Sequence, residues 1–435
     1  MAAGNYGTAR LDRGGTGIDL VELALPFFIV LNFIYSSFYN ALPEEYLTPI
    51  AALTFAGQAG LAVVSLLSRP GWWRWRLFFV IMVLPFVWLA AYLILRQTID
   101  FPQMLRYLGG FYMGVLVFGH YDRFPTRLVA WGAVLSVVWI MLWSMTQPLY
   151  LHSNEAEFEE PVPGWWAAVV GNGRLAPFHG GYENPHSSGY MALALMLVVH
   201  QSWLAGAIPA QVMGASVFFS MVYILGCFST QVLFAAVVYF GCYGLFTRRI
   251  SRPMKLVVAL AGMIIMGIIL TENEERKAAV RVDTDIKWEE LGSGRLGTWA
   301  ERAFMISIRD GPRLWLGTGI GSDFMPSIMW RLKDAPSHNV FLTMMIESGI
   351  IGSIAYWAAL IMMMRALGRL GICLFSVVFV TAMIGNGITL RPMPFLMFFI
   401  AVAMGMQAVE RDRKLEELEV QRRRMAARLA DRDRY

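Results

Sequence analysis

The sequence predicts an all-α polytopic membrane protein with about twelve transmembrane helices. Of the 435 residues, 57% are hydrophobic and 14% are aromatic. Charged residues make up only 15% of the chain, well below the roughly 25% that is usual in soluble domains. The hydrophobic residues gather in segments close to the ~20 residues that a helix needs to cross a bilayer. These three observations argue against a soluble domain.

Twelve apolar segments are candidates for the spans. No small-residue cleavage site follows the first of them, which predicts an uncleaved helix rather than a signal peptide. All three cysteines lie inside apolar segments, so we expect neither a disulfide framework nor a metal site. The predicted spans are residues 19–39, 50–68, 77–95, 107–121, 128–145, 187–205, 208–228, 230–246, 256–270, 338–363, 371–388 and 395–409.

Basic residues between the spans predict that both termini are cytoplasmic. Segments assigned to the inner side hold 22 of the 36 Lys and Arg residues. The outer side holds 14, but ten of these lie in one long loop, which the positive-inside rule discounts. The predicted organisation is a cytoplasmic segment 1–18, nine spans within 19–270, an outer loop 271–337, three spans within 338–409 and a basic tail 410–435.

The tail is expected to be a cytoplasmic helix lying on anionic lipid, with a partner helix or a short coiled coil as the alternative.

Two outer loops are long. Residues 146–186 contain four clustered glutamates and the pair Trp165-Trp166. Residues 271–337 contain ten basic and eleven acidic residues, so this loop is dense in charge but nearly neutral.

Part of the second loop, residues 294–309, has the pattern of an amphipathic helix. Arg295, Arg302 and Arg309 are spaced by seven residues, so on a helix they drift by only about 20° per step and form one stripe. Guanidinium groups bind phosphate oxygens in pairs. The stripe therefore predicts a pyrophosphate-binding surface. The alternative is a set of interfacial arginines that contact lipid phosphates or pair with Glu301 and Asp310.

A histidine, His338, lies where this loop meets the tenth predicted span. Imidazole has an ordinary pKa of about 6.5, so it can accept a proton from a hydroxyl at neutral pH. His338 is the candidate general base and Asn339 a candidate substrate contact; the alternative is a residue that only anchors a helix end. His120 and His200 lie at inner helix ends and are expected to be structural. The weaker site candidates are His152, His179 and His186.

Two further features lie near His338. The run Gly317-Thr318-Gly319-Ile320-Gly321 can form a nest of N–H groups for an anion, or an ordinary glycine-rich turn. No strand precedes it and no lysine follows it, so the Rossmann and P-loop patterns do not apply. Glu347 lies about 13 Å deeper along the same helix and on roughly the opposite face. We expect Glu347 to pair with an arginine of another helix.

These motifs together resemble the O-antigen ligase and polymerase superfamily. The resemblance covers much of the second half of the chain. Its parts are Asn184-Pro185 opening a helix, Ser293-Gly294-Arg295 leading to Trp299, the run Gly317–Gly321, and Ser337-His338-Asn339 followed by Leu342, Glu347, Gly349 and Gly352.

The resemblance implies a glycosyltransferase of GT-C-like architecture in the inner membrane of a Gram-negative bacterium, with a periplasmic active site. A ligase of this kind transfers O-antigen from undecaprenyl pyrophosphate to a sugar hydroxyl of lipid A–core. A polymerase extends the glycan on its own lipid carrier and is the alternative. The modest length and the single dominant late loop favour the ligase. The implied partners are both lipid-linked glycans and membrane lipids, and no nucleic acid is expected.

The resemblance also implies roles for individual residues. His338 corresponds to the general base, and Arg295, Arg302 and Arg309 correspond to residues that hold the pyrophosphate. Arg174 matches the family's arginine before the Asn-Pro motif, at a longer spacing. At the start of the eighth helix, relatives often have an arginine after Ser/Thr, whereas Gln231 follows Ser229-Thr230 here.

For the donor that the resemblance implies, elementary chemistry favours direct displacement. Undecaprenyl pyrophosphate is a good leaving group, so arginines can stabilise the departing charge where other enzymes use a metal. We therefore expect inversion at the anomeric carbon, without a metal, a cofactor or a covalent intermediate. A transporter or lipid flippase is the rival class. It is disfavoured because the predicted spans contain few ionisable residues, whereas transporters keep such residues at mid-membrane.

Overall fold

The computed structural model describes most of the predicted spans and about half of the second long loop. The described residues are 20–37, 44–68, 72–96, 101–121, 124–146, 160–161, 174–175, 185–227, 229–247, 295–327, 333–335, 337–385, 387–389 and 391–432. In these stretches the chain is helical apart from turns and four short strands.

The described helices overlap every predicted span except 256–270, which lies outside the described residues. The strands form two antiparallel pairs, β1 (Glu160–Pro161) with β2 (Arg174–Leu175) and β3 (Met325–Ser327) with β4 (Lys333–Ala335). The helices are α1 (Leu20–Ser37), α2 (Glu44–Ser68), α3 (Trp72–Leu95), α4 (Phe101–His120), α5 (Thr126–Thr146), α7 (Pro185–Leu204), α8 (Ala210–Gly226), α9 (Thr230–Phe246), α11 (Arg295–Ser307), α12 (Gly311–Leu316), α13 (Val340–Arg365), α14 (Arg369–Ile384) and α15 (Pro392–Arg432).

The composition and exposure of these helices are those of an all-α membrane protein. Five of the described helices, α2, α3, α5, α13 and α15, contain segments long and apolar enough to cross a membrane. On α3, Phe79, Phe86 and Leu93 are spaced by seven residues and are 60%, 63% and 67% exposed. A soluble monomer rarely exposes such a stripe, whereas a membrane helix presents it to lipid. The number of twelve spans and their orientation stay predictions.

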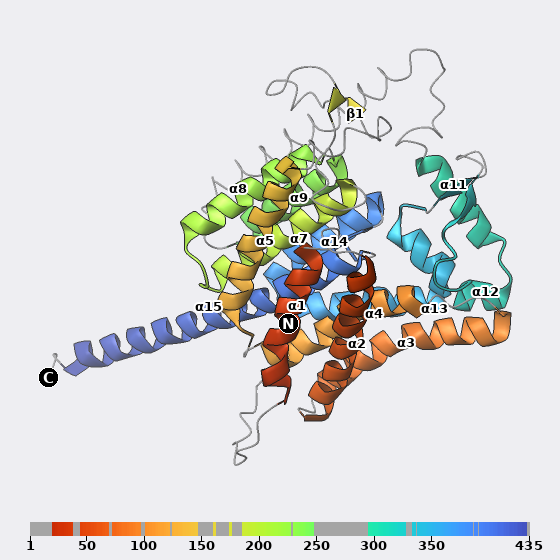
Figure 1. Cartoon of the computed structure of the whole chain (residues 1–435). Coiled ribbons are helices and arrows are strands. Elements are labelled where there is room, and N and C mark those ends of the chain that lie inside the picture. The colour runs from red at the N-terminus through yellow and green to blue at the C-terminus, as the bar shows by residue number, and fades with distance from the viewer. Residues whose placement is uncertain are drawn as a thin grey trace.

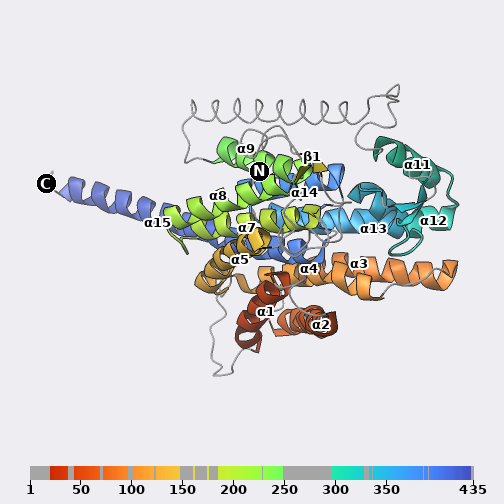
Figure 2. The same ribbon diagram turned by 45° about the horizontal axis from the view of Figure 1, so that its top comes forward.

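The centre of the bundle is formed by α7 and the first half of α15. Ten consecutive residues of α7, 190–199, are at most 1% exposed, and residues 395–404 of α15 are completely buried. A helix that is apolar on all sides is stable only when other helices surround it. These two helices pack against each other, and α4, α5, α8 and α9 pack around them (Figures 1 and 2).

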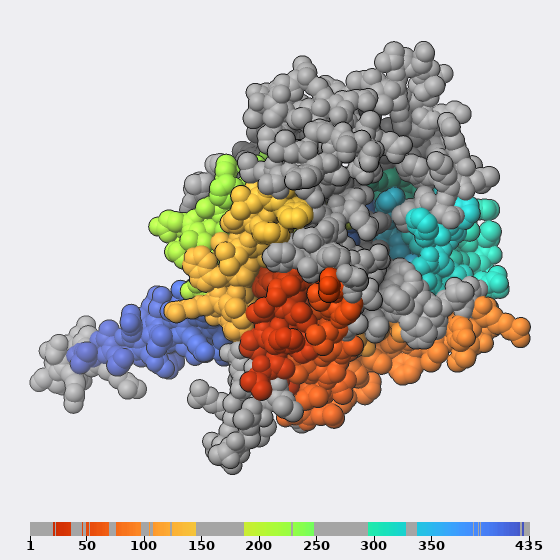
Figure 3. All heavy atoms as spheres, in the orientation of Figure 1, coloured from red at the N-terminus to blue at the C-terminus, as the bar shows by residue number. Residues whose placement is uncertain are grey.

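Beyond the bundle, α15 continues as one unbroken helix to Arg432. Residues 411–426 are exposed, and this tail projects from the body of the molecule (Figure 3). No glycine or proline follows Gly405 before the helix ends, so nothing bends the chain. The predicted helix is therefore present as the continuation of α15, and its contact with anionic lipid stays a prediction.

The described part of the second long loop lies at the opposite end of the bundle. The amphipathic helix predicted at 294–309 is present as α11, and the shorter α12 follows it. Both views place α11 and α12 beside the start of α13, far from the α15 tail (Figures 1 and 2). This end of the bundle holds His338 and three of the predicted arginines, Arg295, Arg302 and Arg309.

Candidate functional site

The backbone of His338 has an unusual conformation. Its φ is +52°, in the left-handed region that residues other than glycine rarely adopt. The residues on either side are buried, whereas His338 itself is half-buried. Asn339 begins α13, and its Oδ1 accepts hydrogen bonds from the N–H groups of Phe341 at 3.0 Å and Leu342 at 3.2 Å. A helix cap thus fixes the chain directly after the histidine.

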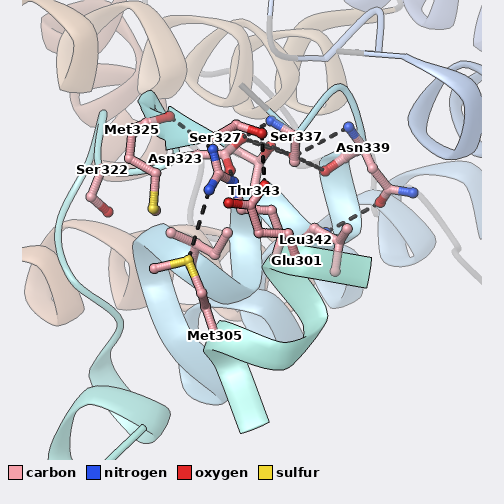
Figure 4. Close-up of polar contacts among 12 residues, drawn as sticks. Glu301, Met305, Ser322, Asp323, Met325, Ser327, Ser337, Asn339, Leu342 and Thr343 are labelled. Carbon is pink, nitrogen blue, oxygen red and sulfur yellow. Dashed lines mark hydrogen bonds and ion pairs between the residues drawn. The ribbon is translucent and has the colours of Figure 1, made fainter. Parts of the chain in front are cut away.

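The residue before His338 is held by a buried carboxylate, Asp323. Oδ2 of Asp323 accepts hydrogen bonds from the Ser337 N–H at 2.9 Å and the Ser337 hydroxyl at 2.8 Å. It also accepts one from the Thr343 hydroxyl at 2.8 Å. Figure 4 shows Ser337 and Thr343 converging on Asp323. The indole N–H of Trp299 donates to the Ser337 carbonyl at 2.7 Å. Sequence reasoning missed Asp323, which lies within a charge-rich loop.

Arg302 belongs to the same cluster and has no exposed surface. Its Nε lies 3.8 Å from Oδ1 of Asp323, and Nη2 donates to the Met325 carbonyl at 2.9 Å. The guanidinium therefore holds the turn that carries Asp323 and the start of β3. The predicted stripe on one face of α11 does not form, because Arg302 points into the protein. Its geometry makes it a positioning residue and gives no support to a pyrophosphate contact.

The Arg309 side chain contacts a break in helix α13. Gly349 has φ +62°, which interrupts the helix and leaves carbonyl groups without helical partners. Nη1 of Arg309 donates to the carbonyls of Ile346 at 3.0 Å and Met345 at 3.3 Å. Burial lowers the pKa of this guanidinium, an effect that nearby Arg313 increases and two aspartates offset. Arg309 thus stabilises a helix end, which leaves the predicted pyrophosphate role without support.

The glycine-rich run completes the cap of this broken helix. The N–H groups of Thr318 and Gly319 donate to the carbonyls of Ile346 and Glu347 at 2.8 Å and 3.1 Å. The Gly321 N–H donates to Oε1 of Glu347 at 2.9 Å. The nest predicted for an anion therefore binds a helix end and the Glu347 carboxylate. The arginine partner expected for Glu347 stays a prediction beside this backbone contact.

Arg295 is the first residue of α11, and its side chain contacts the end of a bundle helix, α14. Its Nη1 donates to the carbonyl of Ile384, at the end of α14, at 2.8 Å. The Asn339 amide donates to the preceding carbonyl, that of Met383, at 3.2 Å. The candidate phosphate-binding arginine and the neighbour of the candidate base thus bind consecutive carbonyls. Two residues 44 positions apart in the sequence are brought to one place by the last turn of α14.

Gln231 and Tyr190 extend this cluster. With the Gln231 amide oriented so that both neighbours are satisfied, its oxygen accepts from Nη2 of Arg295 at 2.7 Å. Its nitrogen then donates to the Tyr190 hydroxyl at 3.1 Å. A side chain at Gly385 would meet both Gln231 and Tyr190. Burial lowers the pKa of the Arg295 guanidinium, and Tyr190 partly offsets this effect.

A second arginine, Arg391, lies on the other side of Tyr190. Its guanidinium carbon is 5.0 Å from the centre of the Tyr190 ring, and Nη1 donates to the Ser187 hydroxyl. Among the described residues, none is a hydrogen-bond partner of its buried Nε. Burial lowers the pKa of Arg391, and Tyr190 partly offsets this effect. Sequence reasoning counted Arg391 only as a basic residue of an outer loop.

The remaining predicted residues lie elsewhere or outside the described side chains. Arg174 is in β2, opposite Pro161 of β1. The side chains of Arg174 and His186 are not among those described. His152, His179 and Asn184 lie outside the described residues. His120 and His200, predicted to be structural, are buried and contact Ser65 and Tyr239.

The arrangement suits an anion and a proton transfer. Two half-buried arginines, Arg295 and Arg391, one half-buried imidazole and several helix N-termini gather at one end of the bundle. Among the described residues, no group of three or more His, Cys, Asp or Glu side chains could hold a metal ion. No family model matches the chain, and no curated protein is significantly similar to it in sequence.

Proposed function

We propose that this protein is an O-antigen ligase. It transfers a glycan from undecaprenyl pyrophosphate to a sugar hydroxyl of lipid A–core at the periplasmic face of the bacterial inner membrane. The observation that carries the proposal is the meeting of Arg295 and the His338 segment on consecutive carbonyls of α14. In the proposal, Arg295 serves as the cation for a leaving phosphate and His338, next to Asn339, as the base for an attacking hydroxyl.

In the proposed reaction, the acceptor hydroxyl attacks the anomeric carbon of the donor sugar. The bond from that carbon to the phosphate oxygen breaks, and the configuration inverts. The hydroxyl proton passes to the His338 imidazole, and undecaprenyl pyrophosphate leaves with the electron pair. General base catalysis of this kind contributes about 10²- to 10⁴-fold to the rate.

Arg295 would stabilise the charge that develops on the leaving group. Its guanidinium is anchored before substrate arrives, because the Ile384 carbonyl and Gln231 both accept its hydrogen bonds. A donor that is already in place reorganises little during the reaction, and such donors typically contribute about 10²- to 10³-fold. The partial burial of the group strengthens its interaction with a phosphate.

The test is glycan transfer by purified protein, with undecaprenyl-pyrophosphate-linked O-glycan as donor and lipid A–core as acceptor, in the presence of EDTA. We expect a slower-migrating lipopolysaccharide band with the wild type and its loss with His338→Ala. Arg295→Ala should reduce the rate about 100-fold or more. The matched control is Arg313→Ala, since the exposed Arg313 side chain makes one long 3.9 Å surface ion pair, with Asp310, within the described part of the chain.

Other products would point to other functions. A lengthened lipid-linked glycan, with lipid A–core unchanged, would identify a polymerase. Full activity of folded His338→Ala or Arg295→Ala would refute the roles proposed for these residues. Loss of activity in Arg313→Ala equal to that in Arg295→Ala would show that the loop, and not one guanidinium, is needed.

One observation favours the rival transporter class. Transporters often use a broken helix with an ionisable residue nearby, and α13 is interrupted at Gly349 beside the buried Glu347. In this protein, however, Thr318, Gly319 and Arg309 bind the carbonyls freed by the break. Substrate flipping by folded protein, with no glycan product, would favour the transporter.

A further inference from the structure

The polarity of helix α11 is reversed relative to an amphipathic helix that faces water. A helix on the surface of a soluble protein turns its apolar side toward the core and its charged side toward solvent. In residues 295–309 every charged side chain instead forms a hydrogen bond with another part of the chain. These side chains belong to Arg295, Glu301, Arg302 and Arg309.

The outward face of α11 carries no charge. Its exposed residues recur at intervals that place them on one side of the helix, and they are Ala300, Ala303, Phe304, Ser307 and Ile308. Phe304 and Ile308, 64% and 66% exposed, form one row of this face. Ala303 and Ser307 form the other. Ile308 follows the last residue of α11 and continues the helical turn, since its N–H donates to the Phe304 carbonyl at 3.2 Å. Such an apolar face needs a partner surface.

The helix that follows α11 connects this face to the lipid-facing surface of the bundle. α12 packs against α3, the helix that exposes a stripe of Phe79, Phe86 and Leu93 (Figure 1). On α12, the Trp315 side chain is 51% exposed. Tryptophan is enriched where a protein passes from acyl chains to headgroups. The neighbourhood of α3 therefore favours lipid as the partner of the α11–α12 segment.

Backbone contacts set the depth of α12 along the bundle. The Thr318 N–H, just after α12, donates to the Ile346 carbonyl at 2.8 Å, and a Cβ atom at Gly349 would meet the Trp315 carbonyl. These contacts lie about 9–14 Å along α13 from its start at Val340. α13 is long and apolar enough to cross a membrane, whose headgroup layers are about 5–8 Å thick on each side. α12 therefore reaches the depth at which acyl chains begin.

We propose that the outward face of α11 lies at the boundary between the headgroups and the acyl chains of one membrane leaflet. The row of Phe304 and Ile308 inserts among the tops of the acyl chains, and the row that contains Ser307 lies on the hydrated headgroup side. The exposed Arg313 and Asp310, which form a 3.9 Å ion pair, lie at headgroup level. Interfacial helices bury their apolar face about 5–10 Å into this boundary. In the predicted topology this is the outer leaflet.

Lipid contact on this face would fix the height of the candidate site. Away from the outward face, the Trp299 indole donates to the Ser337 carbonyl at 2.7 Å and so holds the residue before His338. The site then lies level with lipid headgroups, where a lipid-linked glycan presents its phosphate. This consequence rests on the proposed function, whereas the lipid contact does not.

The test is fluorescence quenching of single-cysteine variants, labelled with bimane, of the full-length protein in phosphatidylcholine nanodiscs. The quenchers are lipid brominated near the top of its acyl chains and aqueous iodide. We expect brominated lipid to quench Phe304→Cys at least about half as strongly as Phe86→Cys on α3, with weak quenching by iodide. Arg423→Cys in the exposed tail should show the reverse. Unsubstituted protein, labelled in parallel, corrects for the three native cysteines, which are buried or half-buried.

Two results would overturn the proposal. Strong quenching of Phe304→Cys by iodide, with weak quenching by brominated lipid, would show that the face is open to water. Weak quenching by both would show that protein covers the face, either another part of this chain or a partner. If Phe304→Cys does not fold, Ala300→Cys on the same face carries the test, because replacing an exposed alanine removes little packing. The same two results in that variant would overturn the proposal.

Quenching and transfer separate this inference from the proposed function. Quenching of Phe304→Cys by brominated lipid, with no glycan transfer by the wild type, would refute only the proposed function. Glycan transfer by a protein whose outward face of α11 is open to water would refute only the lipid contact.

Discussion

At the scale of single residues, the most informative feature is the backbone of His338. A side chain in the left-handed region costs roughly 1–2 kcal/mol relative to the ordinary conformations. His338 adopts this conformation between two residues that the protein holds firmly, Ser337 and Asn339. Strain that the surroundings impose is typical of functional sites, where it fixes the direction of a side chain. We infer that the chain sets the imidazole's position at a cost in stability.

This inference predicts different effects of two substitutions on stability. His338→Gly should be as stable as His338→Ala or more stable by up to about 1 kcal/mol, because glycine adopts positive φ without strain. Both variants should lose glycan transfer by about the same factor, about 100-fold or more, because both lack the base. Thermal unfolding in detergent and the transfer assay measure the two effects. A glycine variant clearly less stable than the alanine variant would contradict the strained backbone.

At the scale of elements, the broken helix α13 is fitted to the loop before it. Gly317 and Gly349 both have positive φ, and their backbones approach closely. A Cβ atom at Gly317 would lie 2.5 Å from the carbonyl carbon of Glu347. Only glycine allows this contact, so the loop 317–321 and the break in α13 depend on each other.

Replacing a loop glycine that makes this contact should therefore weaken the packing of the loop 317–321 against α13 and lower the stability of the protein. We expect Gly317→Ala to lower stability by about 2 kcal/mol, from the strained φ and the close contact combined. Gly311→Ala is the matched control, since nothing lies within 4 Å of a Cβ at this position in the same loop. It should be neutral or slightly stabilising, because alanine is favoured in a helix. Equal melting temperatures of the two variants would contradict the fitted contact.

A second link between elements is the buried pair Arg302 and Asp323. Removing one partner of a buried ion pair leaves an unpaired charge and typically costs about 3–5 kcal/mol, whereas replacing both costs much less. We expect Asp323→Asn alone to destabilise more than the double variant Asp323→Asn with Arg302→Met. A double-mutant cycle of unfolding in detergent measures this difference. Additive effects would show that the 3.8 Å pair contributes nothing.

At the scale of the whole molecule, the two ends of the bundle are chemically different. One end holds α11 and α12, and the other continues into the charged α15 tail (Figure 1). His338 and the half-buried Arg295 belong to the first end, because they lie at the starts of α13 and α11. Reactive groups at one end and an exposed tail at the other fit a protein that works on one side of a membrane.

Single cysteines can test this orientation. Ser307→Cys on α11 and Arg423→Cys in the tail both replace exposed residues, whereas the three native cysteines are buried or half-buried. An impermeant maleimide added to intact bacterial cells with a permeabilised outer membrane should label Ser307→Cys and leave Arg423→Cys unlabelled. Labelling of the tail variant alone would reverse the predicted topology, and labelling of both would contradict opposite sides.

The sequence predicted the helical segments well because long apolar runs must be helical in a bilayer, where no water satisfies the backbone. It also located α11 from its amphipathic pattern. It did not predict where the arginines of the segment 294–309 point. Seven-residue spacing places Arg295, Arg302 and Arg309 on one side of a helix, but their long side chains reach three different partners.

The sequence by itself determined the class of protein, the segments that form helices, and the polar end that contains His338. These follow from composition and local pattern, which short-range physics controls. Only the tertiary structure decided which polar groups meet, because Arg391, Tyr190, Gln231 and Arg295 are up to about 200 residues apart and join through packing of α7, α9, α11 and α14. It also assigned Asp323 a place beside His338, through hydrogen bonds that no sequence spacing indicates.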